Sequence, residues 1–325
     1  MSTGLTGLTG LTGFAVLPLP WPFEREYMQL ALAAGLVIGI CAPLIGTFLV
    51  QQRLSLMGDG IGHLALAGIA AGLLLEVWPV WSAMVVAAVG ALSIEWLRSR
   101  RRATSDLALA LWFYGGIAAG VVLASRSTGG SGAILPYLFG SILTVDRSEV
   151  LLVVLLGLGI VVTVAAFGRT LFAIVIDEES ARVAGLPVGA GNAVLAVLTA
   201  VTVVAAMQVV GVLLVAALMV LPVATSRNLA RSFRGTLVGA AGIGAFAVVA
   251  GLAAARQWAL APGGSIVLVA AGTFAAVGVL GGRTGARRPV LVEAPAPGTA
   301  PRDGRDPHDD HEHEHDHDHP GPGSG

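Results

Sequence analysis

Residues 149–167 read EVLLVVLLGLGIVVTVAAF, a run of 19 residues in which Glu149 is the only charge. A hydrocarbon core about 30 Å thick requires roughly 20 apolar residues in a helix, at about 1.5 Å of rise per residue. Similar runs recur through the 325 residues, of which 55% are hydrophobic and only 12% charged. Because unpaired backbone groups are too costly in lipid, we expect an all-α, polytopic membrane protein.

Hydropathy predicts nine candidate spans. A count of eight stays open, because the stretch 191–226 could form two helices that meet near Met207 and Gln208, or one bent helix. The candidate spans are 27–50, 58–76, 79–97, 106–124, 149–167, 191–206, 209–226, 235–255 and 264–281.

All 19 basic residues are arginines, and their positions predict the orientation. With nine spans, one side of the membrane receives Arg53, Arg98, Arg100, Arg101, Arg102, Arg169, Arg182, Arg227, Arg231, Arg234, Arg283, Arg287 and Arg288; the other receives mainly Arg25, Arg126, Arg147 and Arg256. Basic residues gather in cytoplasmic loops, so we expect a plasma-membrane protein with its N-terminus outside and its C-terminal tail in the cytoplasm. The net charge of −1 argues against a nucleic-acid partner.

Composition divides the chain into three parts. Residues 1–25 predict a disordered leader, 26–282 a membrane domain, and 283–325 a disordered tail rich in Pro, Gly and charge. The tail contains HDDHEHEHDHDHP, in which imidazoles and carboxylates can bind zinc, nickel or copper with poor selectivity. Its candidate metal ligands are His308, His311, His313, His315, His317 and His319. The interleaved acids argue against a purification tag.

The stretch 53–68, RLSLMGDGIGHLALAG, places Asp59 four residues before His63 in an otherwise apolar span. Residues at this spacing share one face of a helix. Ionisable groups inside a membrane are expensive and mark an ion or substrate path, and a nitrogen and an oxygen donor together suit a divalent transition metal. Two ligands fill only half of a coordination shell, so water, backbone or a second copy of the chain would supply the rest. The alternative is that the two side chains hydrogen-bond to each other or to a helix end.

Two connections are more than simple turns. Residues 168–190 form a predicted cytoplasmic loop with a short helix from Asp177 to Ala184, stopped by Gly185 and Pro187. Such a helix can dock a soluble partner, or it can be a solvated loop helix without one. Within 125–148, the segment ILPYLFGSILTV is apolar enough to enter the outer leaflet as a short helix.

The absence of lysine has a mechanistic consequence. A phosphate-binding loop of the GxxxxGK[ST] kind needs its lysine to reach the nucleotide phosphates. The chain therefore cannot hydrolyse ATP by that route. It is not expected to be an enzyme.

Over about residues 27–282 the sequence resembles the permeases of metal-type ABC importers, which take up zinc, manganese or iron. The matching stretches are RLSLMGDGIGHLALAG at 53–68, FGSILTVDRSEV at 139–150, ARVAGLPVG at 181–189 and VVGVLLVAALMVLPVATSRNLARSF at 209–233. In this family a GDxxxH motif supplies the metal contacts, which correspond to Asp59 and His63. Relatives usually have alanine and serine where this chain has Gly60 and Gly62, which puts the geometry of the site in question.

The resemblance also implies partners. The permeases form homodimers in the lipid bilayer, bind two cytoplasmic ATPase subunits and accept metal from an extracytoplasmic solute-binding protein. The loop DEESARVAGLP would be the coupling helix in the ATPase groove, and ILPYLFGSI would lie at the outer gate. The implied coupling residues are Asp177, Glu178, Glu179, Ala181, Arg182, Gly185, Leu186 and Pro187.

These observations favour a permease that imports a divalent metal, most simply Zn²⁺, by alternating access driven by a partner ATPase. No cofactor is expected to stay bound, since the metal is the cargo. Import of Mn²⁺ or Fe²⁺ by the same mechanism is the nearest alternative. A stand-alone secondary metal transporter and a permease for metal chelates are the others, but the first would need further intramembrane acids and histidines, and the second a wide pore without a paired metal site.

Overall fold

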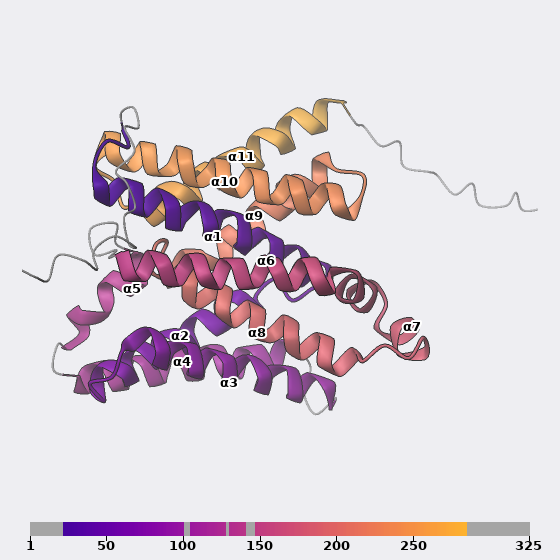
Figure 1. Cartoon of the computed structure of the whole chain (residues 1–325), viewed down its shortest axis with the longest axis horizontal. Coiled ribbons are helices and arrows are strands. Elements are labelled where there is room, and N and C mark those ends of the chain that lie inside the picture. The colour runs from indigo at the N-terminus through magenta and orange to yellow at the C-terminus, as the bar shows by residue number, and fades with distance from the viewer. Residues whose placement is uncertain (1–21, 101–104, 128–129, 141–146, 285–325) are drawn as a thin grey trace, which may run out of the picture. The chain divides into compact units, whose positions relative to one another are not determined.

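The computed structural model describes residues 22–100, 105–127, 130–140 and 147–284, and in these ranges it is built from helices (Figure 1). The elements are α1 (Glu26–Gln51), α2 (Met57–Leu74), α3 (Pro79–Ser99), α4 (Ser105–Arg126), the 3-10 turn η1 (Gly130–Ile134), α5 (Leu135–Phe139), α6 (Arg147–Ile176), α7 (Glu178–Val183), α8 (Val188–Met207), α9 (Val212–Leu229), α10 (Phe233–Trp258) and α11 (Pro262–Thr284).

Nine helices in the described part are long and apolar enough to cross a membrane, which confirms the all-helical prediction and selects nine spans over eight. The stretch 191–226 forms two helices, α8 and α9, separated at 208–211. One boundary was wrong: residues 168–176 were predicted as loop, but α6 continues to Ile176. The segment TLFAIVI that follows Arg169 is apolar and free of Gly and Pro, so nothing in it stops the helix. The predicted leader (1–25) lies largely, and the tail (283–325) almost wholly, outside the described residues.

Close helix contacts in the bundle are made at glycines. Gly39 of α1 faces Gly244 of α10, and a Cβ added to Gly39 would lie only 2.9 Å from the Gly244 carbonyl oxygen. Gly46 of α1 similarly faces the backbone carbonyl of Met219 in α9. Membrane helices associate through this kind of close backbone packing, because burying apolar side chains gains little when the surroundings are lipid.

Helix α2 begins halfway through the bundle rather than at its end. Gly58, in its first turn, lies against Met219, the eighth residue of the 18-residue α9. One turn further, the backbone of His63 lies against Gly116, the twelfth residue of the 22-residue α4. Helix α2 is also the most completely buried of the nine spanning helices. Asp59 and His63 therefore lie at the middle depth of the bundle.

The two ends of the bundle differ in charge. Figure 1 places α7 at one end and α5 at the opposite end. The α7 end, called here the arginine-rich end, carries Arg53, Arg98, Arg100, Arg169, Arg182, Arg227, Arg231 and Arg234 in the described ranges, against Arg25, Arg126, Arg147 and Arg256 at the α5 end.

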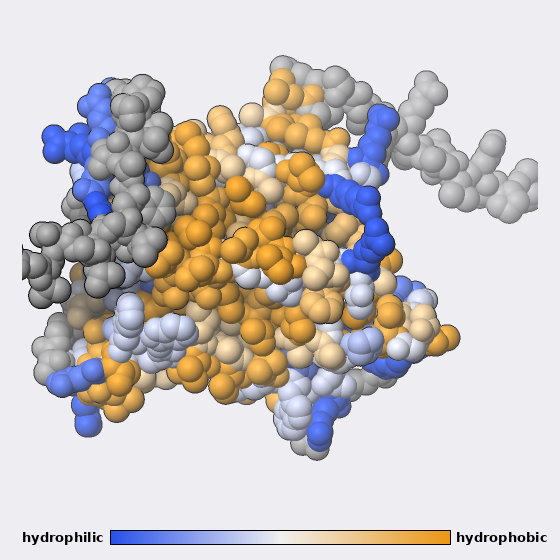
Figure 2. Space-filling view, viewed as in Figure 1, coloured by the Kyte–Doolittle hydropathy of each residue, from blue (hydrophilic) through white to orange (hydrophobic). Residues whose placement is uncertain are grey.

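Between the two ends, α6 exposes an apolar stripe. Leu151, Leu155, Leu158 and Val162 recur at helical spacing and are at least 49% exposed. Figure 2 shows a broad hydrophobic surface in this region, with hydrophilic residues gathered toward its two edges. This surface is what a lipid-facing helix requires, because the side chains meet hydrocarbon instead of water.

Candidate functional site

Asp59 opens onto a groove between α2 and α4. The groove has a volume of about 280 Å³, and Gly60, Leu109, Phe113 and Tyr114 are among its lining residues. Asp59 itself is half-buried, whereas Tyr114 is 69% exposed at the rim. The carboxylate is therefore reached from the side of the single chain, between the two helices.

His63 lies one turn along the same face and is buried, with 9% of its surface exposed. Its ring packs edge-on against Phe113, with 4.6 Å between ring centroids and an interplanar angle of 79°. The Nδ1 atom is buried and has no hydrogen-bond partner. No hydrogen bond joins His63 to Asp59, so the structure does not have the mutual pair that the sequence left open as an alternative.

This arrangement offers a carboxylate oxygen and an imidazole nitrogen with unused bonding capacity, on one helix face. Leaving a buried polar atom unpaired costs about 1–3 kcal/mol, which a ligand at Nδ1 would offset. Among the residues that the structure describes, no group of three or more His, Cys, Asp or Glu side chains could hold a metal. Asp59 and His63 are thus at most half of a coordination shell within one chain.

The two glycines between these residues differ in their surroundings. A Cβ on Gly60 would make only ordinary contacts, the nearest being a Leu109 side-chain atom at 3.9 Å. A Cβ on Gly62 would lie 3.3 Å from Val212 Cγ1, close enough to displace that side chain slightly. The space at Gly62 is therefore matched to this chain's own packing against α9, while Gly60 leaves room at the groove.

The short helix predicted between Asp177 and Ala184 is present as α7 at the arginine-rich end. Asp177 caps its N-terminus, accepting hydrogen bonds from the amides of Glu179 and Ser180 at 3.1 and 3.0 Å and from the Ser180 hydroxyl at 2.6 Å. Glu178 and Arg182 form an ion pair of 3.0 Å along its surface.

The inner face of α7 is fixed to the bundle. Ala181 is 4% exposed and packs with Ile174, Val188 and Leu186. Gly185 ends the helix with φ +79°, a conformation that only glycine adopts without strain, and Pro187 follows. The outer face stays open: Glu179 is exposed, and Val183, which the sequence analysis did not single out, is 86% exposed. An exposed valine beside charged residues suits a docking surface.

Hydrogen bonds from Ser180, through its hydroxyl and its amide, hold the pKa of Asp177 below the usual range of an aspartate. The cap therefore stabilises α7 at every pH above the ordinary aspartate pKa, and this stabilisation is lost as the pH falls through the lowered pKa. The carboxylate remains charged throughout neutral and mildly acidic conditions.

At the other end, α5 packs against the break between α8 and α9. Gly140 and Gly211 both have positive φ, +73° and +86°, and a Cβ on Gly211 would lie 2.5 Å from Leu138 O and Gly140 N. In the same break, both polar atoms of the Gln208 amide are buried without a partner. The sequence analysis missed Gln208 as a polar group, because a single amide beside a helix end carries no motif.

Helix α4 supplies the other residues that sequence reasoning missed. Phe113, Tyr114 and Gly116 contact or border the Asp59 groove, although they lie some 50 residues away along the chain. The only available signal was the Gly115–Gly116 pair within a span, which permits close helix contact. The six tail histidines lie outside the described residues.

Comparison with known proteins identifies the fold and its class. A model of the ABC 3 transport family matches residues 24–280, about four fifths of the sequence. The chain belongs to this family. The predicted likeness to the permeases of metal-type ABC transporters is therefore confirmed.

Among its relatives, the permease is 31% identical over 250 residues to the manganese transport system membrane protein MntC of Halalkalibacterium halodurans, covering 77% of this chain and 86% of that protein. It is 27% identical over 252 residues to the high-affinity zinc uptake system membrane protein ZnuB of Haemophilus influenzae, covering 77% and 95%.

A solved structure agrees with this permease fold. PsaBC from Streptococcus pneumoniae, in complex with a Fab, superposes with a TM-score of 0.71 at 31% sequence identity, covering 78% of this chain and 91% of that one. Since most of both chains is aligned, the likeness extends over the whole membrane bundle.

Proposed function

We propose that this permease imports a divalent transition metal, with Zn²⁺ as its preferred cargo. The observation that carries the proposal is the pairing of Asp59 with a buried, unpartnered His63 Nδ1 at the middle depth of the bundle. An ionisable pair at that depth is expensive unless it serves a transported ion. Relatives named for manganese and for zinc transport support a divalent metal as the class of cargo.

Zinc is proposed because imidazole nitrogen is a favoured zinc ligand and because the tail carries six histidines. Manganese is the second candidate, since a carboxylate suits it well and two relatives with about 30% identity are named as manganese permeases. The two metals differ in their demand for nitrogen ligation, which gives His63 a larger role for zinc.

The proposed partners occupy three surfaces. A cytoplasmic ATPase subunit docks on the exposed face of α7, with the arginine-rich end in the cytoplasm. An extracytoplasmic solute-binding protein delivers metal at the α5 end. A second copy of the chain covers the groove between α2 and α4, where Leu56 and Tyr114 are 68% and 69% exposed, and completes the coordination shell.

In the proposed cycle, the metal passes α5 and exchanges part of its water for Asp59 and His63. Closure of the ATPases moves α7, which is joined directly to α6 and packed through Ala181 onto α8. Because α6 and α8 both line the core beside α1, a shift at α7 reaches the bundle as a rigid movement of helices. The metal is then released toward the arginine-rich end.

The test is cell-associated zinc and manganese, measured by elemental mass spectrometry in metal-starved, uptake-deficient cells. The cells express the chain with its ATPase and binding protein, and the controls are an ATPase-inactive complex and His63→Ala. Zinc accumulation lost in both controls is the expected result. Manganese accumulation instead would change the cargo and keep the mechanism, whereas accumulation that survives ATPase inactivation would overturn the importer proposal.

Coupling through α7 makes a separate prediction. Asp177→Ala removes the cap and should lower uptake several-fold without lowering the amount of permease in the membrane, because a short helix depends strongly on its N-cap. Asp177→Asn is the matched control, since asparagine also caps well, and it should retain most uptake. Equal uptake by wild type and Asp177→Ala would contradict the coupling role.

The lowered Asp177 pKa fixes the sign of a pH effect. Between about pH 8 and about pH 5 the carboxylate stays ionised, so the difference between wild type and Asp177→Asn should not change across this range. Uptake ratios of the two variants measured at both pH values check this.

The tail makes the last prediction in this group. We infer that its histidines bind cytoplasmic metal and slow transport when loaded. Deleting residues 303–325 should leave initial zinc uptake unchanged and relieve its inhibition by internal zinc. Unchanged inhibition after the deletion would refute this role.

A further inference from the structure

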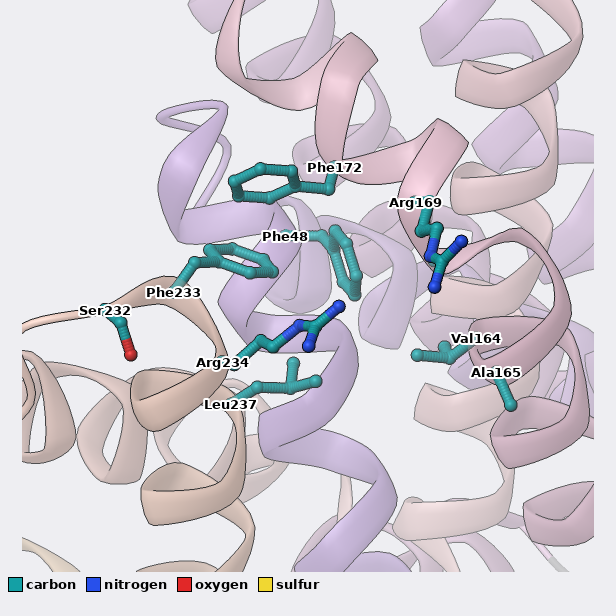
Figure 3. A pocket seen from close by; sticks show the side chains of 10 residues that line it. Phe48, Val164, Ala165, Arg169, Phe172, Ser232, Phe233, Arg234 and Leu237 are labelled. Atoms are coloured by element: carbon teal, nitrogen blue, oxygen red, sulfur yellow. The ribbon is translucent and has the colours of Figure 1, made fainter.

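A second pocket, far from the Asp59 groove along α1 and α6, lies near the arginine-rich end. It has a volume of about 600 Å³ and is bordered by α1, α6 and α10 (Figure 3). Its apolar floor is built on Phe48, which is 1% exposed, with Phe172 and Phe233 around it. The Phe233 ring lies 5.5 Å from that of Phe48 and 4.4 Å from that of Phe172, so the three rings form one aromatic surface.

Two guanidinium groups border this aromatic surface. Arg169 comes from α6 and Arg234 from α10, and Figure 3 shows both side chains around Phe48. Neither has an ion pair or a hydrogen bond with any residue that the structure describes, and the pocket lining contains no carboxylate. The pocket thus combines an apolar floor with uncompensated positive charge.

The start of α10 adds to this charge. Arg234 lies in the first turn of a 26-residue helix that has no acidic residue there. The N-terminus of a helix carries a partial positive charge, so a cation in the first turn is unfavourable and an anion is favoured. The local sequence gathers positive charge where a helix of this length normally has an acid.

The depth of the pocket corresponds to a membrane surface. Counted from Val150, where the apolar part of α6 begins, roughly 20 residues cross the hydrocarbon core and reach residue 169. The 30-residue α6 is longer than the core requires, so its last turns extend beyond it. Arg169 therefore lies at the headgroup level, directly beyond the apolar stripe of α6.

From these features we propose that the pocket binds an anionic phospholipid, with its phosphate between Arg169 and Arg234 and the start of an acyl chain over Phe48. Basic pockets between membrane helices suit such headgroups, and the apolar floor continues into the lipid-facing side of α6. In the orientation proposed above, this lipid comes from the cytoplasmic leaflet. It would hold α6, which leads into α7, against α10.

The experiment is native mass spectrometry of the delipidated permease–ATPase complex, titrated separately with phosphatidylglycerol and phosphatidylcholine of the same acyl chains. The wild type should retain phosphatidylglycerol in preference to phosphatidylcholine. The double variant Arg169→Gln/Arg234→Gln should bind phosphatidylglycerol about tenfold more weakly, since each arginine contributes to the attraction of anionic lipid.

Two further variants separate this site from general charge effects. Arg227→Gln/Arg231→Gln removes the same charge from exposed positions at the same end and should bind as the wild type does. Gly168→Leu keeps both arginines but projects into the pocket, where a Cβ would have its nearest contact at 3.9 Å, and should also weaken binding.

Equal loss in both arginine pairs, or equal retention of phosphatidylglycerol by wild type and Arg169→Gln/Arg234→Gln, would overturn the site. The same titration is repeated on the permease without its ATPase. Binding seen only in the absence of the ATPase would also overturn the proposal, because the pocket would then be covered by that subunit in the complex. None of these outcomes depends on which metal is transported.

Discussion

Asp59→Ala and His63→Ala are each expected to reduce metal uptake to background while leaving the amount of permease in the membrane unchanged. Asp59 is half-buried beside an open groove and His63 carries an unpartnered Nδ1, so neither side chain holds the bundle together by hydrogen bonds. Removing one ligand from a shell that is only half supplied by this chain removes a large share of its metal affinity. Uptake of zinc and manganese by cells with the intact complex is the measurement.

Neutral substitutions sharpen this test. Asp59→Asn keeps the shape of the side chain and removes its charge, and it should abolish uptake as alanine does. Glu76→Gln removes a charge from an exposed residue just beyond the other end of the same helix and should transport normally. Normal uptake by both Asp59→Ala and His63→Ala would sink the proposed site, and loss of uptake in Glu76→Gln would indicate a general charge effect instead.

Gly116→Ala is expected to impair both uptake and stability. An added Cβ would lie 2.9 Å from the Leu64 amide nitrogen and 3.0 Å from the His63 carbonyl carbon, which are backbone atoms that cannot rotate away. Helices α2 and α4 must separate at the level of His63, and overpacking of this kind costs about 1–3 kcal/mol. Thermal unfolding of the purified permease and metal uptake by cells are measured together.

The adjacent residue provides the control. A Cβ on Gly115 would meet nothing within 4 Å, so Gly115→Ala should leave uptake intact and stabilise α4 by up to about 1 kcal/mol. A Gly116→Ala variant as stable and active as Gly115→Ala would show that the close contact between α2 and α4 at His63 is not required.

The sequence could predict the spans because each is a long apolar run. It failed at the end of α6, because hydropathy marks where a helix leaves lipid and not where the helix stops. The break at 208–211 could not be decided in advance, since Gly211 adopts φ +86° only when α5 packs against it. Tertiary contact, not local preference, selects two helices there.

The same distinction holds at the site. Spacing alone placed Asp59 and His63 on one helix face, and the structure adds that His63 packs against Phe113 and that α2 starts in the middle of the bundle. Those features depend on residues of α4 and α9 that lie far away in sequence, so no local pattern could give them. The sequence did predict α7 closely, because its cap, its ion pair and its terminating glycine are all local signals.

The midway start of α2 bears on how long a metal stays. Asp59 lies in the first turn, where the partial positive charge of the helix end stabilises the carboxylate and repels a cation. At an association rate constant of about 10⁸ M⁻¹s⁻¹, a site with nanomolar affinity empties roughly once in ten seconds, whereas one with micromolar affinity empties about a hundred times per second. By weakening its own carboxylate in this way, the permease shortens the dwell time of each ion and raises the ceiling on turnover.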